Sequence, residues 1–144
     1  MKDALEILIP LLKAFEGCRL KAYQDVAGIW TIGYGETLGV KAGDVWTQEH
    51  ADERLRVRAA QFLVGVLQRC PQLYLESESR KAACASLAYN IGLGAFAASS
   101  VCRKTKRTDY EGAADSFLLW KFSGGREVRG LLLRRRAERQ LYLT

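Results

Sequence analysis

The sequence changes character at Gly17, where a helical pattern gives way to a β pattern interrupted by glycines. Upstream of Gly17, apolar residues recur at three- and four-residue steps, the spacing of one buried helix face: Leu5, Leu8, Ile9, Leu12 and Phe15. Gly17 suits the left-handed cap that ends many helices. Pro10 conflicts with one continuous helix, since it fits an earlier turn, a kink, or a helix that begins near residue 10 with proline in its first turn. We expect the last of these.

Residues 20–37 are rich in β-branched and aromatic side chains, and Ala27-Gly28 interrupts them. This pattern predicts a small antiparallel hairpin or a three-stranded sheet. Because side chains alternate along a strand, Thr31, Gly33 and Gly35 are expected on one face. The two glycines on that face would let a bulky ligand approach the backbone.

Two carboxylates and a hydroxyl surround this junction of helix and sheet. Glu16 ends the helical pattern, Asp25 lies nine positions later in the following turn, and Thr31 lies six positions further on a strand. Cleavage of a glycosidic bond requires one carboxyl that donates a proton and a second that activates water or attacks the anomeric carbon. The stretch is therefore a candidate acid–base site, although most such triplets taken singly have no joint role.

The positions of these side chains suggest different roles. A carboxyl at a helix C-terminus meets the negative end of the helix dipole, which favours the protonated form required of an acid, so we expect Glu16 to be that acid. The turn around Asp25 is more solvated, which keeps a carboxylate ionised as base, nucleophile or electrostatic support. Thr31 does not titrate usefully, and we expect its hydroxyl to position a water molecule beside Asp25.

Length and composition favour one domain. The chain has 144 residues, is 49% hydrophobic and contains two prolines, enough for one sizeable core and too little for two ordinary domains. Thr47 begins a segment close to the capping-box pattern, which predicts a connecting helix over 47–68. We expect a β-containing lobe over 15–46 and a helical lobe over 69–144, with breaks at 92–94, 105–108 and 123–125. This is an α+β protein, mainly helical with one small sheet.

The charge and cysteine content limit the possible partners. The net charge of +6 and the pI near 9.3 favour nucleic acid, anionic lipid or the anionic bacterial envelope, and charge alone does not choose among them. Arginines concentrate near the C-terminus, where a solvated helix face with Glu127 and Glu138 interleaved is the simplest interpretation. The four cysteines form no C-x-x-C pair, so we expect no metal, no cofactor and buried free thiols, with a disulfide possible outside the reducing cytosol.

Four motifs in order resemble one known family. They are the Glu16–Asp25–Thr31 spacing, A-Y-N-I-G-L-G at 88–94, Y-E-G-A-A-D-S-F at 110–117, and R-G-L-L-L-R-R-R-A-E-R-Q-L-Y at 129–142. Together they resemble the phage-type lysozymes, the endolysins of glycoside hydrolase family 24. The resemblance covers nearly the whole chain and implies a two-lobed lysozyme-like fold with a small antiparallel sheet in the N-terminal lobe and a helical C-terminal lobe.

The resemblance also implies an activity. It indicates a muramidase that hydrolyses the β-1,4 bond between N-acetylmuramic acid and N-acetylglucosamine in bacterial peptidoglycan, lysing the host cell, and it leans toward inversion of configuration. It assigns Glu16 as general acid, Asp25 as base or nucleophile and Thr31 as the residue that positions water. The expected partner is peptidoglycan rather than nucleic acid, and we expect a monomer that depends on a separate holin to reach the wall.

Further residues are carried over from the family with their alternatives. Tyr89 and Asn90 resemble residues that line the saccharide cleft, although Asn90 also suits a helix terminus. Thr37 and Ser99 are carried over as substrate contacts, and Arg135 or Arg136 is expected to reach Glu16 or the substrate. Trp120 is expected to anchor the C-terminal lobe.

Glu36 departs from the family motif, which commonly has a histidine or an aromatic residue near this position. A strand-end glutamate is usually exposed, and that is the expectation here; the alternatives are an influence on neighbouring carboxyls or pairing with an arginine. His50, the one histidine of the chain, is expected at the surface of a helix start rather than in the site.

The N-terminal apolar run is short. Between charged residues it extends over six positions, 7–12, too few for a membrane span or the core of a signal peptide. Some phage lysozymes carry a signal-arrest-release anchor, which we do not expect here. We therefore expect no stable membrane insertion, folding in the host cytoplasm, and action in the periplasm after the membrane is permeabilised.

Two other functions remain open from sequence. A lytic transglycosylase works with one catalytic glutamate and leaves an anhydro-sugar product, whereas the Asp25 and Thr31 partners favour water as acceptor. A non-catalytic module would hold cell wall, or would bind nucleic acid through the C-terminal arginines.

Overall fold

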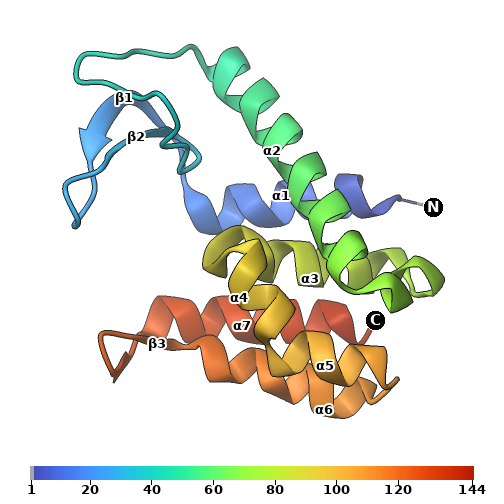
Figure 1. Ribbon diagram of the computed structural model, residues 1–144. Coiled ribbons are helices and arrows are strands. Elements are labelled where there is room, and N and C mark those ends of the chain that lie inside the picture. Colours follow the sequence, from blue (N-terminus) through green and yellow to red (C-terminus); the bar gives the residue numbers. More distant parts are fainter. Residues whose placement is uncertain (1) are drawn as a thin grey trace.

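The computed structural model describes residues 2–144 and places a small hairpin at one end of a helical body (Figure 1). Helix α1 (Ala4–Glu16) leads into strands β1 (Arg19–Gln24) and β2 (Trp30–Gly33), and α2 (Gln48–Arg69) returns from the hairpin to the body. The remaining elements are η1 (Pro71–Leu75), α3 (Glu78–Ile91), α4 (Leu93–Ala98), α5 (Ser100–Lys106), α6 (Tyr110–Ser116), η2 (Phe117–Trp120), β3 (Phe122–Ser123), β4 (Arg126–Glu127) and α7 (Arg129–Tyr142). The expected mainly helical α+β fold is confirmed.

Helix α1 is continuous through Pro10, so the expectation of a helix that begins near residue 10 is wrong. The helix starts after Asp3, whose side chain accepts a hydrogen bond from the Glu6 amide at 2.9 Å. Pro10 lies on the exposed side, while Leu8 and Leu12 are fully buried. Burial of the apolar face stabilises the helix enough to offset the backbone hydrogen bond that proline cannot donate.

Strands β1 and β2 form the predicted antiparallel hairpin, with Tyr23 opposite Thr31. The chain turns immediately after β2, because the backbones of Ile32 and Glu36 exchange two hydrogen bonds of 2.9 Å. Gly35 therefore lies in a turn, and the expected shared face of Gly33 and Gly35 is wrong. The Trp46 ring covers Gly33, so Gly33 offers no open surface to a ligand.

Gly33 offers a test of this packing. It has φ +64°, and an added Cβ would lie 2.6 Å from the Trp46 ring, whereas Gly28 has φ +81° and open space around it. We expect Gly33→Ala to lower the free energy of unfolding by about 3 kcal/mol and Gly28→Ala by about 1 kcal/mol, because only the first adds a clash to the left-handed strain. Denaturant melts measure both, and equal losses would contradict the packing role of Trp46.

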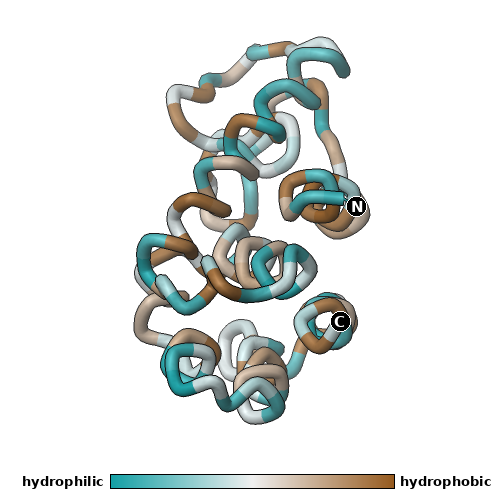
Figure 2. The backbone as a smooth tube through the Cα atoms, turned by 90° about the vertical axis from the view of Figure 1, so that its right-hand side faces the viewer, coloured by the Kyte–Doolittle hydropathy of each residue, from teal (hydrophilic) through white to brown (hydrophobic). Residues whose placement is uncertain are grey.

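Helix α2 begins as the sequence predicts. The Thr47 side chain accepts from the His50 amide at 3.1 Å, and the helix continues to Arg69. His50 is exposed, as expected. Its ring lies edge-on to the Trp46 ring, with 4.6 Å between the ring centroids. The first turns of α2 are hydrophilic in Figure 2 because this part of the helix is rich in charged residues.

Helix α3 is the central helix of the body and packs against α1, α2 and α7. Seven consecutive residues are buried on all sides of it: Ala82, Ala83, Cys84, Ala85, Ser86, Leu87 and Ala88. Small side chains allow the neighbouring helices to approach closely. Cys70, Cys84 and Cys102 are buried as free thiols, and Cys18 is half-buried.

A second two-stranded sheet, β3 with β4, lies in the C-terminal part, where the sequence indicates only a break. Gly124 and Gly125 form its turn with φ of 57° and 78°. Each strand has two residues, too few for an alternating pattern to be visible in sequence. Across residues 2–144 we find no helix with the length and apolar character needed to cross a bilayer.

Candidate active site

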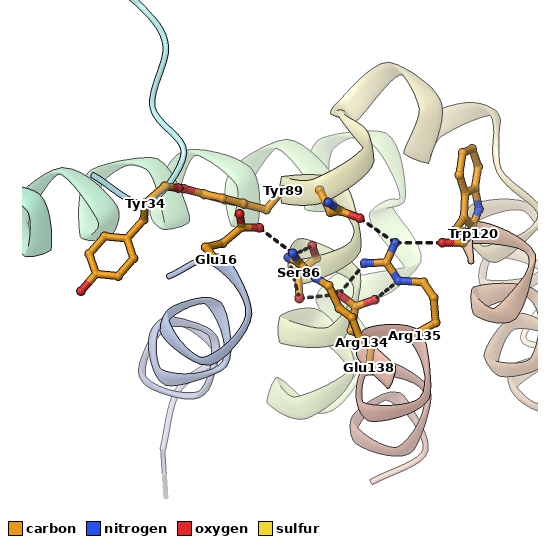
Figure 3. Close-up of polar contacts among 9 residues, drawn as sticks. Glu16, Tyr34, Ser86, Tyr89, Trp120, Arg134, Arg135 and Glu138 are labelled. Carbon is orange, nitrogen blue, oxygen red and sulfur yellow. Dashed lines mark hydrogen bonds and ion pairs between the residues drawn. The ribbon is translucent and has the colours of Figure 1, made fainter. Parts of the chain in front are cut away.

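Glu16 lies at the C-terminal end of α1 and pairs with an arginine from the far end of the chain (Figure 3). Arg134 Nη1 lies 2.5 Å from Glu16 Oε1, and the side chains are 5% and 19% exposed. The predicted contact of Arg135 or Arg136 with Glu16 is therefore wrong, while a substrate contact from either arginine stays a prediction. Three consecutive arginines on a helix point in directions about 100° apart, and α7 turns Arg134 toward Glu16 while Arg136 remains exposed.

The ion pair adds an influence that the sequence does not reveal. The hydrogen bond that Arg134 donates to Glu16 is charge-assisted, and such bonds are stronger than those between neutral groups. A guanidinium from α7 therefore fixes the side chain at the end of α1.

Glu138 and Arg135 lie behind this pair in the interior, both 0% exposed. Glu138 Oε1 lies 2.7 Å from Arg135 Nε, and Glu138 Oε2 accepts from Arg134 Nε at 3.2 Å and from Ser86 Oγ at 2.5 Å. The interpretation of the arginine segment as a solvated face is therefore wrong for Arg134, Arg135 and Glu138. They form a buried ionic network, in which Arg135 Nε and Glu138 Oε1 are close as an ion pair but make no aligned hydrogen bond.

Asp25 is held in the turn of the hairpin by its own backbone. Its Oδ1 accepts hydrogen bonds from the amides of Ala27 and Ile29, each at 2.9 Å. Within residues 2–144, Oδ2 has no hydrogen-bond partner, and the residue is half-buried. One carboxylate oxygen thus fixes the turn while the other stays available.

Thr31 is 4% exposed, and its hydroxyl donates to the Ile29 carbonyl at 2.9 Å. The backbone of Ile29 therefore contacts both residues, with its N–H on Asp25 and its C=O on Thr31. The hydroxyl oxygen keeps its acceptor capacity. Asp25 and Thr31 thus share one backbone partner, Ile29, on the hairpin.

Glu36 is buried, so its expected exposure is wrong and the alternative of an arginine pair is correct. The Glu36 side chain is 7% exposed, and Arg54 Nη2 on α2 lies 2.5 Å from Oε1. The tight turn after β2 points Glu36 back toward α2. The local sequence does not reveal this turn, because it shows only that Glu36 ends a strand. The pair fastens the loop after β2 to α2.

Tyr89 ties α3 to the same loop. Its hydroxyl donates to the Tyr34 carbonyl at 2.7 Å, and its ring packs on Phe62 at 5.1 Å between centroids. Burial raises the pKa of Tyr89, which keeps it a neutral donor. Gly35, the residue after Tyr34, lies close to the acid candidate, because a Cβ on Gly35 would lie 3.6 Å from Glu16 Oε2.

The other predicted substrate contacts have different surroundings. Asn90 Oδ1 accepts from Arg135 Nη1 at 2.9 Å. Thr37 is exposed. Ser99 is buried at the start of α5, where its oxygen accepts from the Cys102 amide at 3.1 Å. Trp120 packs against the core, and its carbonyl accepts from Arg135 at 3.4 Å.

A cavity of about 410 Å³ opens beside Glu16. Its walls come from α1, α3 and α7 and include Phe15, Glu16, Asn90, Leu131 and Arg134. Two larger hollows, of about 460 and 540 Å³, lie along α7, and Glu16 lines neither of them. The cavity beside Glu16 is the candidate site because it combines apolar walls with a carboxylate, a guanidinium and an amide.

Tyr34 makes the stability of the folded protein depend on pH in the alkaline range. Burial and the hydrogen bond from its hydroxyl to Asp52 Oδ1, 2.8 Å long, raise its pKa from 10.0 to about 12. Because the folded state favours the protonated phenol, this contribution to stability is complete below pH 10.0 and is lost as the pH rises through about 12. Tyr34→Phe should be less stable than the parent near neutral pH, with the difference shrinking at alkaline pH. Urea melts across this range test it, and a constant difference would contradict the assignment.

The helical body with its small antiparallel hairpin defines a fold of the lysozyme type. The phage lysozyme family model matches residues 13–138. The chain is 43% identical over 136 residues to the endolysin of Acyrthosiphon pisum secondary endosymbiont phage 1, covering 92% of each.

Solved structures of a phage lysozyme and of a muramidase domain have the same fold as this chain. A P22 lysozyme variant has 38% identity and a TM-score of 0.82 over 100% of both chains. The muramidase domain of SpmX from Asticaccaulis excentricus has 31% identity and a TM-score of 0.87, covering 96% of this chain and 95% of the domain. The chain belongs to the phage lysozyme family. Its activity is accordingly that of an endolysin-type peptidoglycan hydrolase.

Proposed function

We propose that the protein is a muramidase that hydrolyses the β-1,4 bond between N-acetylmuramic acid and N-acetylglucosamine. The observation that carries this proposal is the position of Glu16, on the wall of a cavity and in contact with Arg134. The hairpin supplies a second carboxylate, Asp25, with one oxygen free of partners within residues 2–144.

In the proposed mechanism Glu16 donates a proton to the leaving glycosidic oxygen as the bond breaks. Arg134 then stabilises the Glu16 carboxylate that forms. Asp25 activates a water molecule, or attacks the anomeric carbon, while positive charge develops on the sugar. The Thr31 oxygen accepts a hydrogen bond from that water. The backbone of Ile29 contacts both Asp25 and Thr31, which supports a preorganised site for that water.

Tyr89, Asn90, Thr37 and Ser99 remain proposed substrate contacts. Asn90 has the best support because it lines the cavity beside Glu16. Its Oδ1 accepts from Arg135 Nη1, which fixes the orientation of the amide and supports a role in contacting the sugar. Tyr89 supports the site through the Tyr34 carbonyl, and Ser99 is engaged in a helix cap.

We propose that a monomer acts on the wall. It folds in the host cytoplasm and reaches peptidoglycan in the periplasm after a separate holin permeabilises the membrane. The membership in a family of endolysins supports this route.

The test is product analysis on purified peptidoglycan. We expect release of reducing ends, with the mass of added water in the fragments. Anhydro-sugar ends would instead identify a lytic transglycosylase. Wall binding without cleavage, or DNA binding with a steep dependence on salt concentration, would identify a non-catalytic module.

A further inference from the structure

The buried charges behind Glu16 balance only while Glu138 is ionised. Arg134 and Arg135 are adjacent on α7, 4% and 0% exposed, and two carboxylates contact them, Glu16 at the cavity and Glu138 in the interior. With both carboxylates ionised the four charges sum to zero. When Glu16 takes up a proton, Glu138 is the carboxylate that remains against two buried cations, and each further uncompensated charge is costly in a dry interior.

Glu138 also fixes the orientation of Arg134. Arg134 Nε binds Glu138 Oε2 at 3.2 Å, and Nη2 binds the Ser86 carbonyl at 3.1 Å. Because a guanidinium is planar, holding Nε and Nη2 determines where Nη1 points. That nitrogen contacts Glu16 (Figure 3).

We propose that Glu138 is a positioning residue that aims Arg134 at Glu16 and offsets the two buried arginines, so that Glu16 can take up the proton it donates. The proposal rests on the proposed function, in which Glu16 is the acid. Glu138 acts through Arg134 and lies in the interior rather than among the cavity-lining residues.

On α2, Arg58 adds a positive charge near Tyr89, with its guanidinium 5.4 Å from the centre of the Tyr89 ring, and all the variants proposed below keep it. On α3, Tyr89 and Cys84 face the two carboxylates, and burial raises the pKa of each, which keeps both neutral. On α1, the Phe15 ring lies 5.4 Å from the Arg134 guanidinium.

On the hairpin side, Gly35 presents backbone to Glu16, and Glu36 is neutralised by Arg54. The balance around Glu16 is therefore set by Arg134, Arg135 and Glu138.

Three charge variants test the proposal through the pH profile of peptidoglycan cleavage. Glu138→Gln leaves an excess positive charge, which disfavours proton uptake by Glu16. We expect about tenfold lower kcat near neutral pH, recovery of activity at lower pH, and little change in KM. Arg135→Gln removes a positive charge and should move the alkaline limb of the profile to higher pH. The double variant restores the balance, and its alkaline limb should return toward that of the parent.

The two single variants are expected to shift the pH profile in opposite directions, whereas simple damage to the fold would lower activity in both. Glu76→Gln is the matched control, because Glu76 is a partly buried carboxylate paired with Arg80 at 3.0 Å and lines none of the cavity beside Glu16. We expect its pH profile to match that of the parent. Should Glu138→Gln fail to fold, the Arg135→Gln shift and the double variant still decide the matter.

A parental pH profile for both single variants, or a shift that the double variant does not reverse, would overturn the proposal. Glu16→Gln is measured in parallel. If it retains full activity, the proposed acid is wrong. If it is inactive while the Glu138 and Arg135 variants keep the parental profile, the proposed function stands and only the role of Glu138 fails.

Discussion

Glu16→Gln should abolish cleavage of peptidoglycan while leaving the fold intact. Glutamine has nearly the shape of glutamate and still accepts a hydrogen bond from Arg134, but it has no proton of suitable acidity for the leaving oxygen. General acid catalysis contributes about 10²–10⁴ in rate, so we expect kcat to fall by at least about 10²-fold. Release of reducing sugar by the purified proteins measures the loss.

Glu6→Gln is the control for this variant. Glu6 lies on the same helix, α1, and is exposed. Its replacement should leave both cleavage and melting temperature close to those of the parent. Full activity of Glu16→Gln would remove Glu16 from the mechanism, whereas a large drop in melting temperature would mean that the ion pair with Arg134 stabilises the fold instead.

Asp25→Asn should cause the second large loss, about 10²-fold in kcat, without unfolding the hairpin. The asparagine Oδ1 can accept the same two hydrogen bonds from Ala27 and Ile29 that Asp25 accepts at 2.9 Å. The turn is thus retained while the negative charge that activates water or supports the transition state is removed. Activity assays and circular dichroism together separate the two effects.

Asp44→Asn provides the comparison. Asp44 Oδ2 accepts from the Lys41 amide at 2.8 Å in another loop of the same lobe, so this variant removes a turn carboxylate of the same kind. We expect it to keep full activity. Near-parental activity in Asp25→Asn would show that a single carboxylate suffices, and it would favour the transglycosylase reaction.

Local interactions explain which elements the sequence predicts well. Thr47 caps α2 through a bond to an amide three residues away, and Asp25 fixes the hairpin turn through amides two and four residues away. Contacts of such short range leave a recognisable pattern in the sequence. The Glu16, Asp25 and Thr31 spacing is visible for the same reason, because all three lie within one helix–hairpin unit.

The errors of sequence-based prediction concern residues whose environment comes from distant parts of the chain. Pro10 is tolerated because α3 buries the opposite face of α1, and Glu36 is buried because it meets Arg54 eighteen residues later. Neither partner is marked by a local pattern. A proline and a strand-end glutamate have the same local appearance whether or not such a partner exists.

The sequence by itself determines the hairpin, the capped α2, and the candidate carboxylates at the end of α1 and in the following turn. Only the tertiary structure decides that Arg134 rather than its neighbours meets Glu16, across 118 positions of sequence, and that Glu138 is buried behind it. The reason is physical: backbone hydrogen bonds and caps are set within a few residues, whereas the rotational phase of α7 against α1 and α3 depends on how whole helix faces pack.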